Sequence, residues 1–440
     1  MHVPFIVASL AITLVIGLTL AVVLPIQVAV GSIDLGWIAH SQVHGHAQVT
    51  GFAGLFVIGV AARLAPRFAG RPLAAPRLVR PALWMLLAGV VARIISQPVA
   101  QHAPFAALLT IGALLELLGA LVALVIFSLT LRPLRRNVSP HVLLLWTAPA
   151  WLLVQALVGA WWLVELASEG QRIVPATRDA ALLHMQVFGV LGSALVGVGL
   201  RTFPTFFGAR STTTVRAWAI ATLVEGGLVT WAVGAVARGV DPDISTIPSA
   251  IGQLAVGSGL LLFAVSTGWW ALRHRLASSS RGLIWGLRPV LASLTVTGAL
   301  LVLGSVEALT DGRAVSFASS DAARHVFLIG VVTLGIVTMA QLILPEFASE
   351  RFVRQPGAWR GPFFGGMLGA ATVLRGLLPW AGLESPARHW GTATAGVLTL
   401  AALAVFAMLF ARAHRAHRAY LVRLASRRRG EAISLREVDR

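Results

Sequence analysis

The chain alternates between long apolar stretches and short polar segments that contain arginine. About twelve stretches are long enough to cross the hydrocarbon core of a membrane as helices, which takes about 20 residues each. We expect them at residues 4–30, 46–65, 81–100, 105–131, 141–165, 180–203, 216–238, 248–272, 285–308, 321–345, 362–382 and 389–411. No basic segment precedes the first stretch, which favours a membrane helix over a cleavable signal peptide. The pattern predicts an all-α polytopic membrane protein with one transmembrane domain, 1–411, and a basic tail, 412–440.

Composition agrees with this class. The 440 residues are 57% hydrophobic and 12% charged, whereas soluble domains average about 45–50% apolar and about 25% charged residues. The chain has no cysteine, which excludes disulfides, thiolate metal sites and iron–sulfur clusters. The net charge is +18, but the basic residues lie between apolar blocks and at the C-terminus, so we expect no nucleic-acid partner.

The arginines predict the orientation. All 35 basic residues are arginine, and 27 of them fall in the inner loops and the tail if the N-terminus lies inside. The positive-inside rule therefore places both termini in the cytoplasm. In the tail, basic and apolar residues alternate. We expect a helix lying on anionic lipid there, with docking to another protein as the alternative.

Three segments of the chain repeat the same pattern. They begin at His46, His184 and His325, and each has glycine five residues later, proline 20 later and phenylalanine 22 later. The histidines are 138 and 141 residues apart, which predicts three four-helix repeats in a pseudo-threefold arrangement. Each histidine would open the second helix of its repeat, and each glycine would leave room for a neighbouring helix or a flat ligand. The repeats would cover about 1–137, 138–280 and 281–411.

A histidine inside a membrane helix indicates a functional site, although a helix cap or an interhelical hydrogen bond is the structural alternative. Three histidines at equivalent positions make that alternative weaker. Imidazole is a common ligand of metals and of haem, and two histidines on facing helices can occupy both axial positions of a haem iron.

These features resemble a known group of proteins. Twelve helices with histidines on helices 2, 6 and 10 are similar to the heme–copper oxidase subunit I superfamily. The segment His44-Gly-His46-Ala-Gln48-Val-Thr-Gly51-Phe52, ending in Ala65-Pro66-Arg67-Phe68, resembles its NnrS-type branch. Those are polytopic proteins that contain haem and copper and are linked to nitric oxide metabolism. NnrS proteins usually have a glutamate just after the second histidine of this pair, where the chain has Ala47 and Gln48.

The resemblance implies ligands. The helix 2 and helix 10 histidines of the oxidases hold the low-spin haem, which implies His46 and His325 here. The helix 6 histidine of their copper site matches His184. The other histidines of that centre have no counterpart, and the only tyrosine, Tyr420, lies in the tail. An oxygen-reducing, proton-pumping centre is therefore not expected.

His44 leaves three arrangements open. It could bind a second metal with His184, bind a haem propionate or water, or be exposed. Our working interpretation is a b-type haem, since no cysteine is present for haem attachment, held by His46 and His325. His184 would be left for copper, with His44, or for a second, open-sided haem.

Charged residues inside the apolar stretches are further candidates. Haem propionates favour arginine, and Arg93 and Arg375 lie 47 and 50 residues after His46 and His325. Arg324 is a third candidate for this role. The alternative is that these arginines reach the membrane interface or pair with a glutamate. Glu116 and Glu225 would serve in a proton relay or an ion pair.

The sequence thus predicts a haem-binding protein of a prokaryotic cytoplasmic membrane, acting in redox chemistry or in sensing a diatomic gas, nitric oxide first. A quinol or a cytochrome would donate electrons. One alternative is an enzyme, either a nitric oxide reductase or a quinol-dependent oxidoreductase with a second metal. A cofactor-free transporter and a protein that carries haem in transit are the others, although transporters usually show two halves.

Overall fold

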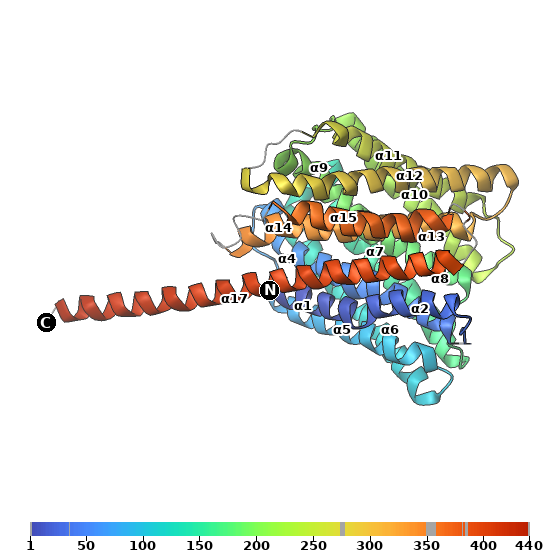
Figure 1. Ribbon diagram of the computed structural model, residues 1–440, viewed down its shortest axis with the longest axis horizontal. Helices are drawn as coiled ribbons and strands as arrows, with labels where there is room; N and C mark the ends of the chain where they lie inside the picture. The colour runs from blue at the N-terminus through green and yellow to red at the C-terminus, as the bar shows by residue number, and fades with distance from the viewer. Residues whose placement is uncertain are drawn as a thin grey trace.

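The computed structural model describes residues 2–34, 36–272, 278–348, 358–380, 382 and 386–438. In these residues, all regular secondary structure is helical, and twelve helical spans are long and apolar enough to cross a membrane. The protein is therefore a polytopic membrane protein, as the hydrophobic pattern predicts. The spans lie alongside one another, and α1 begins at the end of the bundle where α17 leaves it (Figure 1).

The spans consist of α-helices that π-helical and 3₁₀ segments extend. The α-helices are α1 His2–Ile12, α2 Leu18–Ala29, α3 Trp37–His46, α4 Leu55–Ala69, α5 Val79–Ser96, α6 Ala103–Leu131, α7 Pro140–Ser168, α8 Ala176–His184, α9 Ser193–Phe207, α10 Thr214–Val240, α11 Ile247–Thr267, α12 Ile284–Asp311, α13 Phe317–His325, α14 Leu334–Ala348, α15 Arg360–Thr372, α16 Leu378–Trp380 and α17 Pro386–Val438. The π-helical segments are Thr13–Gly17, Ala47–Gly54, Met185–Gly192, Val326–Thr333 and Val373–Leu377. The 3₁₀ segments are Pro76–Leu78, Gln97–Val99, Arg132–Asn137, Trp269–Ala271 and Ser278–Leu283.

Three spans form the centre of the bundle. They are span 2 (Trp37–Ala69), span 6 (Ala176–Phe207) and span 10 (Phe317–Leu342). In the most apolar part of these spans 61, 78 and 67% of the residues are buried, against 39–56% in the other described spans. Their π-helical segments contact one another pairwise. Spans 2, 6 and 10 therefore lie at the centre of the bundle, where they contact one another.

The central spans share one local structure. His46, His184 and His325 are each the last residue of an α-helix, and each is followed by a π-helical segment of eight residues. An α-helix of 15 residues then completes the span. Such π-helical turns occur most often at functional sites. The shared pattern agrees with the sequence repeat, while the three-repeat arrangement of the whole chain stays a prediction.

The three histidines do not open their spans, contrary to the sequence interpretation. The spans begin earlier, at Trp37, Ala176 and Phe317, so the expected starts at 46, 180 and 321 are four to nine residues too late. Their first turns carry polar side chains, among them Asp179 and Asp321. These residues end the apolar run without ending the helix, because helical backbone hydrogen bonds do not depend on hydropathy.

Neighbouring helices fill the space beside the repeat glycines. A Cβ atom on Gly51 would lie 2.8 Å from Ile12, and one on Gly189 would lie 2.9 Å from Trp151. A Cβ atom on Gly330 would collide with Ser293. At all three positions the missing side chain thus allows close helix packing.

The contact between α10 and α11 generates a stability prediction. A Cβ atom on Gly227 would lie 2.7 Å from the carbonyl oxygen of Gly252, whereas one on the adjacent Gly226 would meet nothing within 4 Å. Gly227→Ala should therefore destabilise the fold by about 1–3 kcal/mol through overpacking. Gly226→Ala is the matched control and should be neutral or stabilising because alanine favours helix. Thermal unfolding of the two variants in detergent checks this, and equal midpoints would contradict the close packing.

Candidate functional site

The candidate site residues gather at one end of the bundle, which we call the histidine end. It is the end where α8 and α13 lie (Figure 1). His44 and His46 belong to α3, His184 ends α8, and His325 ends α13. His44 and His46 are two residues apart on one helix, so their side chains point to different sides.

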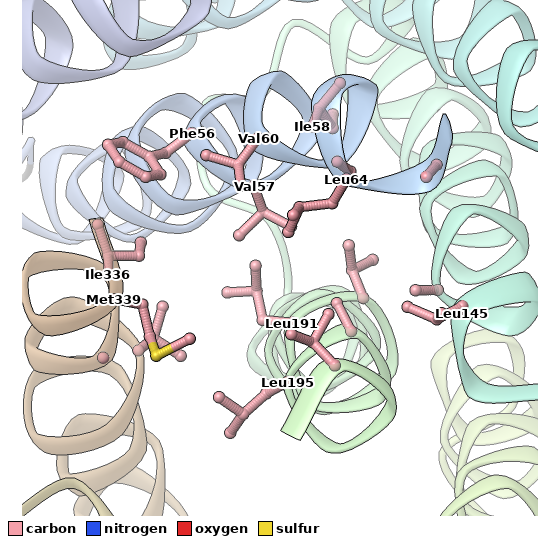
Figure 2. A pocket seen from close by; sticks show the side chains of 18 of the residues that line it. Phe56, Val57, Ile58, Val60, Leu64, Leu145, Leu191, Leu195, Ile336 and Met339 are labelled. Atoms are coloured by element: carbon pink, nitrogen blue, oxygen red, sulfur yellow. The ribbon is translucent and has the colours of Figure 1, made fainter. Parts of the chain in front are cut away.

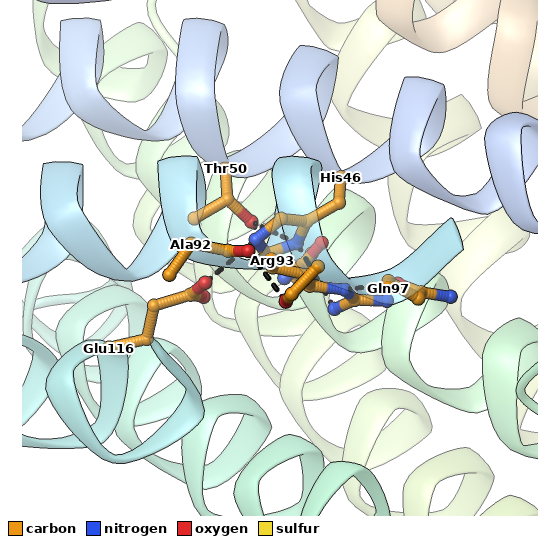
Figure 3. A network of polar contacts seen from close by, with 8 residues as sticks. His46, Thr50, Ala92, Arg93, Gln97 and Glu116 are labelled. Atoms are coloured by element: carbon orange, nitrogen blue, oxygen red, sulfur yellow. Dashed lines mark hydrogen bonds and ion pairs between the residues drawn. The ribbon is translucent and has the colours of Figure 1, made fainter. Parts of the chain in front are cut away.

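His46 is the centre of a buried polar network (Figure 3). Its Nε2 atom lies 2.9 Å from Glu116 Oε1, and its Nδ1 atom lies 3.2 Å from Arg93 Nη1. The guanidinium of Arg93 can only donate, so Nδ1 is the acceptor and the Nε2–H group donates to Glu116. The three side chains are buried, with relative exposures of 2% for His46, 4% for Arg93 and 7% for Glu116. Both nitrogens of the neutral ring are thus engaged by charged neighbours.

The network extends across the histidine end. Thr50 lies 3.3 Å from His46 Nδ1 and accepts a hydrogen bond from Gln186 of span 6. On the other side, Arg93 donates to Gln97, and Gln97 donates to Gln42. Gln42 in turn binds the backbone N–H and carbonyl of Val174, the second of them at 2.7 Å. The network therefore fixes spans 2, 3, 4 and 6 relative to one another.

In this arrangement both ring nitrogens of His46 have partners within the protein. A ligating histidine needs one nitrogen lone pair directed at the metal, and the only lone pair of His46 faces Arg93. The pairing of His46 with His325 stays a prediction that the geometry does not favour.

His44 is the histidine that lies near His325. It is close enough to interact electrostatically with His325, Asp321 and Arg375. The Nδ1–H group of His44 donates to the carbonyl of Gly17 at 2.8 Å, in the π-helical segment of the first span. The Nδ1–H group of His325 donates to the carbonyl of Asp321 at 2.9 Å. Among the described residues, no hydrogen bond engages Nε2 of either ring.

Asp321 lies beside His44 and His325 and is surrounded by basic side chains. Its carboxylate accepts two hydrogen bonds from Arg375, at 2.7 and 3.4 Å, and lies 3.2 Å from His325 Nδ1. Arg324 lies 4.0 Å from the same carboxylate. Arg324 also interacts electrostatically with Asp179, as does Arg93.

The three arginines proposed for haem propionates therefore all have acidic neighbours within the protein: Glu116, Asp179 and Asp321. Sequence reasoning missed Asp179 and Asp321. For Asp321 the signal that could have found it is its spacing, because it lies four residues, about one helical turn, before His325 and so faces the same side of the helix. Asp179 lies five residues before His184, a spacing that gives no such signal.

His184 has different surroundings. Its ring stacks on Trp231 with centroids 3.7 Å apart and an interplanar angle of 18°, and it also contacts Phe188. The side chain is buried, and its Nε2 atom has no hydrogen-bond partner. No hydrogen bond or ring contact joins His184 to His44. Within the described ranges, no three His, Asp or Glu side chains are placed to hold a metal ion.

An apolar cavity of about 200 Å³ lies between the central spans, on the side of the π-helical segments away from the histidines. Residues of α4 such as Phe56 and Leu64, and Leu195 and Met339 of the other two central spans, line it (Figure 2). Among the described residues that line it, Thr338 is the only one with a polar side chain. The cavity suits an apolar occupant and offers no charged group to a haem propionate.

Comparison with known proteins does not assign the chain to a family. No protein-family model matches the chain, and a search of curated proteins finds no match either.

The His46 network predicts a large effect of removing one charge. Glu116→Gln keeps the shape but leaves Arg93 without its nearest carboxylate, so we expect destabilisation by about 3–5 kcal/mol, as for broken buried pairs. Adding Arg93→Gln should recover part of this loss. The control is Glu165→Gln, because Glu165 pairs with Arg178 while a third of its side chain is exposed, and such pairs contribute about 0–1 kcal/mol. Thermal unfolding midpoints in detergent measure all four proteins. Equal midpoints for Glu116→Gln and Glu165→Gln would refute the role of the network.

Proposed function

We propose that this protein is a haem-binding integral membrane protein that acts in redox chemistry or in sensing nitric oxide or another diatomic gas. The observation that carries the proposal is the hydrogen bonding that His44 and His325 have in common. Each donates its Nδ1–H group to a backbone carbonyl, and no side chain or backbone group of the described part of the chain forms a hydrogen bond with Nε2 of either ring.

This state is the one that axial ligation needs. Histidines that ligate metals almost always donate their other ring nitrogen to a carboxylate or a carbonyl, which fixes the tautomer and the ring orientation. His44 and His325 come from spans 2 and 10, and they lie within electrostatic range of each other. We therefore assign the axial positions of a b-type haem to His44 and His325, in place of His46.

The arginines around the pair fit a negatively charged cofactor. Arg375 and Arg324 flank Asp321 next to His325. A propionate would share or replace their bonds to this carboxylate, because the guanidinium fork accommodates either group. The Asp321 carboxylate also faces His325 Nδ1, which increases the basicity of the ligand.

When bound, such a haem supplies one-electron redox chemistry, and two histidine ligands favour electron transfer over gas binding at the same iron. The resemblance to NnrS-type proteins points to nitric oxide as the first gas to test. The arginine distribution supports a prokaryotic cytoplasmic membrane with both termini in the cytoplasm. A quinol or a cytochrome would then be the electron donor.

Optical spectra of the purified protein, oxidised and dithionite-reduced, test the ligand assignment. We expect a sharp reduced α-band that is lost in His44→Ala and in His325→Ala, because each variant removes an axial ligand. His46→Gln should keep the band, and so should His141→Ala. His141 serves as a matched control because it bonds to Ser139 at the other end of the bundle.

Loss of the α-band in His46→Gln with retention in His44→Ala would contradict this assignment and restore the His46–His325 pair. Absence of a Soret band from protein produced with ample haem would overturn the haem proposal. A cofactor-free transporter would then be the function to test.

The unpartnered Nε2 atom of His184 favours a second candidate function. A nitric oxide reductase or quinol-dependent oxidoreductase needs an open metal position, and a buried imidazole nitrogen without a partner can hold one. In that case carbon monoxide should shift part of the reduced Soret band, and His184→Ala should abolish the shift while the α-band remains. Copper analysis of the same preparations separates copper from a second haem. A wild-type spectrum that carbon monoxide leaves unchanged, in protein without copper, would exclude this enzyme.

A further inference from the structure

A second polar site, partly buried, lies away from the histidine network, around Glu225. This residue is the twelfth of the 27 residues of α10, so it lies about 17 Å from the start of the helix at 1.5 Å per residue. That depth is close to the middle of the hydrocarbon core. No ion pair of the described residues includes Glu225, whereas Glu116 has His46 and Glu165 has Arg178.

Three neutral donors surround the carboxyl group. Thr147 and Ser193 contact Glu225 Oε1 through their hydroxyl groups at 2.6 and 2.7 Å, and the indole N–H of Trp151 donates to Oε2 at 2.9 Å. Thr147 and Trp151 are one turn apart on α7, and Ser193 begins α9. The donors thus come from spans 5 and 6 and meet the carboxyl group from span 7.

The repeat glycine of span 6 contributes to this site. Trp151 lies directly against Gly189, where a Cβ atom would come within 2.9 Å of the indole. This close contact holds the indole in the position from which it reaches Glu225. A sequence feature that first indicated only helix packing therefore also positions a hydrogen-bond donor.

The hydrogen bonds can satisfy the carboxyl group with or without a proton. When it is ionised, the two hydroxyl groups donate to Oε1. When it is neutral, its O–H group can donate to Thr147 Oγ1, because the Thr147 hydroxyl can direct its own hydrogen to the carbonyl of Leu144, 3.2 Å away. The Trp151 N–H group serves both states. Only hydrogen atoms move between the two arrangements.

We propose that Glu225, with Thr147, Ser193 and Trp151 as positioning residues, is a proton-binding site inside the membrane that takes up and releases a proton. A carboxylate without a cation partner is costly to bury in a low-dielectric medium. Hydrogen bonds from the three donors offset part of this cost. The inference does not depend on haem binding.

Labelling with the lipophilic reagent dicyclohexylcarbodiimide tests the proposal on the full chain in detergent or in vesicles. The reagent adds to a protonated carboxyl group across one of its C=N bonds, so the adduct has the summed mass of the two molecules. Glu225 is half-buried and Gly226 beside it is exposed on the bundle surface, which gives the reagent access from the lipid.

Peptide mass spectrometry should find the adduct at Glu225, with labelling that decreases as the pH rises. Glu225→Gln keeps the shape and should remove the adduct. The internal control is Glu116 in the same digest, which should stay unlabelled because its side chain is buried and bonded to His46. An unlabelled Glu225, or equal labelling of Glu225 and Glu116, would overturn the proposal.

Two further variants test the positioning residues. Thr147→Val and Ser193→Ala each remove a donor to the ionised form. Ser193→Ala should move the pH of half-maximal labelling upward by about one to two units, since a hydrogen bond to a charged group contributes about 1.5–3 kcal/mol. Thr147→Val should move it less, because this variant also removes the acceptor of the neutral O–H group. A merely structural role for these hydroxyl groups would change stability without moving this pH. An unchanged or lowered pH of half-maximal labelling would contradict the proposed site.

Discussion

A ring nitrogen inside a bilayer has no water to bind, so the protein or a ligand must satisfy it. This constraint separates the histidines at the histidine end into two kinds. His46 uses both nitrogens on Arg93 and Glu116 and thereby holds spans 2, 3 and 4 together. Among the residues that the structure describes, no hydrogen bond engages Nε2 of His44, His325 or His184, and the Nε2 atom of His184 is buried. The first kind connects the membrane spans, and we propose that the second kind binds a ligand.

The charges at this end follow the same constraint. Arg93, Arg324 and Arg375 share their surroundings with three carboxylates, those of Glu116, Asp179 and Asp321. Removing a single member leaves an unpaired charge in a low-dielectric medium, which costs more than the pair contributes. A haem propionate entering the cluster would add negative charge beside Arg375. The cofactor and the carboxylates would then share the arginines, which couples cofactor binding to the order of the whole cluster.

Much of the fold was predictable because membrane spans follow from hydropathy alone. The positions of the twelve spans agree with the structure, but the starts of spans 2, 6 and 10 do not. Hydropathy records Asp179 and Asp321 as interruptions, although both lie within helices. The π-helical segments were not predictable, because nothing in the residues 47–54 separates a π-helical from an α-helical hydrogen-bond pattern.

The sequence identifies several residues of the site but does not show which of these side chains bond to one another. The repeat pattern identifies His46 rather than His44, because of these two only His46 has glycine five residues later. Its partner Glu116 has no counterpart at an equivalent position of the other repeats, so no pattern in the sequence connects the two. The role of Gln42, Gln97 and Val174 in the same network depends on long-range contacts. No local sequence pattern indicates contacts between residues so far apart in the chain.

The central claim is that His44 and His325, rather than His46, form the ligand-binding pair of the histidine end. An experimental map of the purified, haem-reconstituted protein, at a resolution that shows side chains, tests this claim most directly. The account predicts haem density between the Nε2 atoms of His44 and His325, with Glu116 still bonded to His46. Iron bonded to His46, or ordered haem at any other pair of side chains, would contradict it.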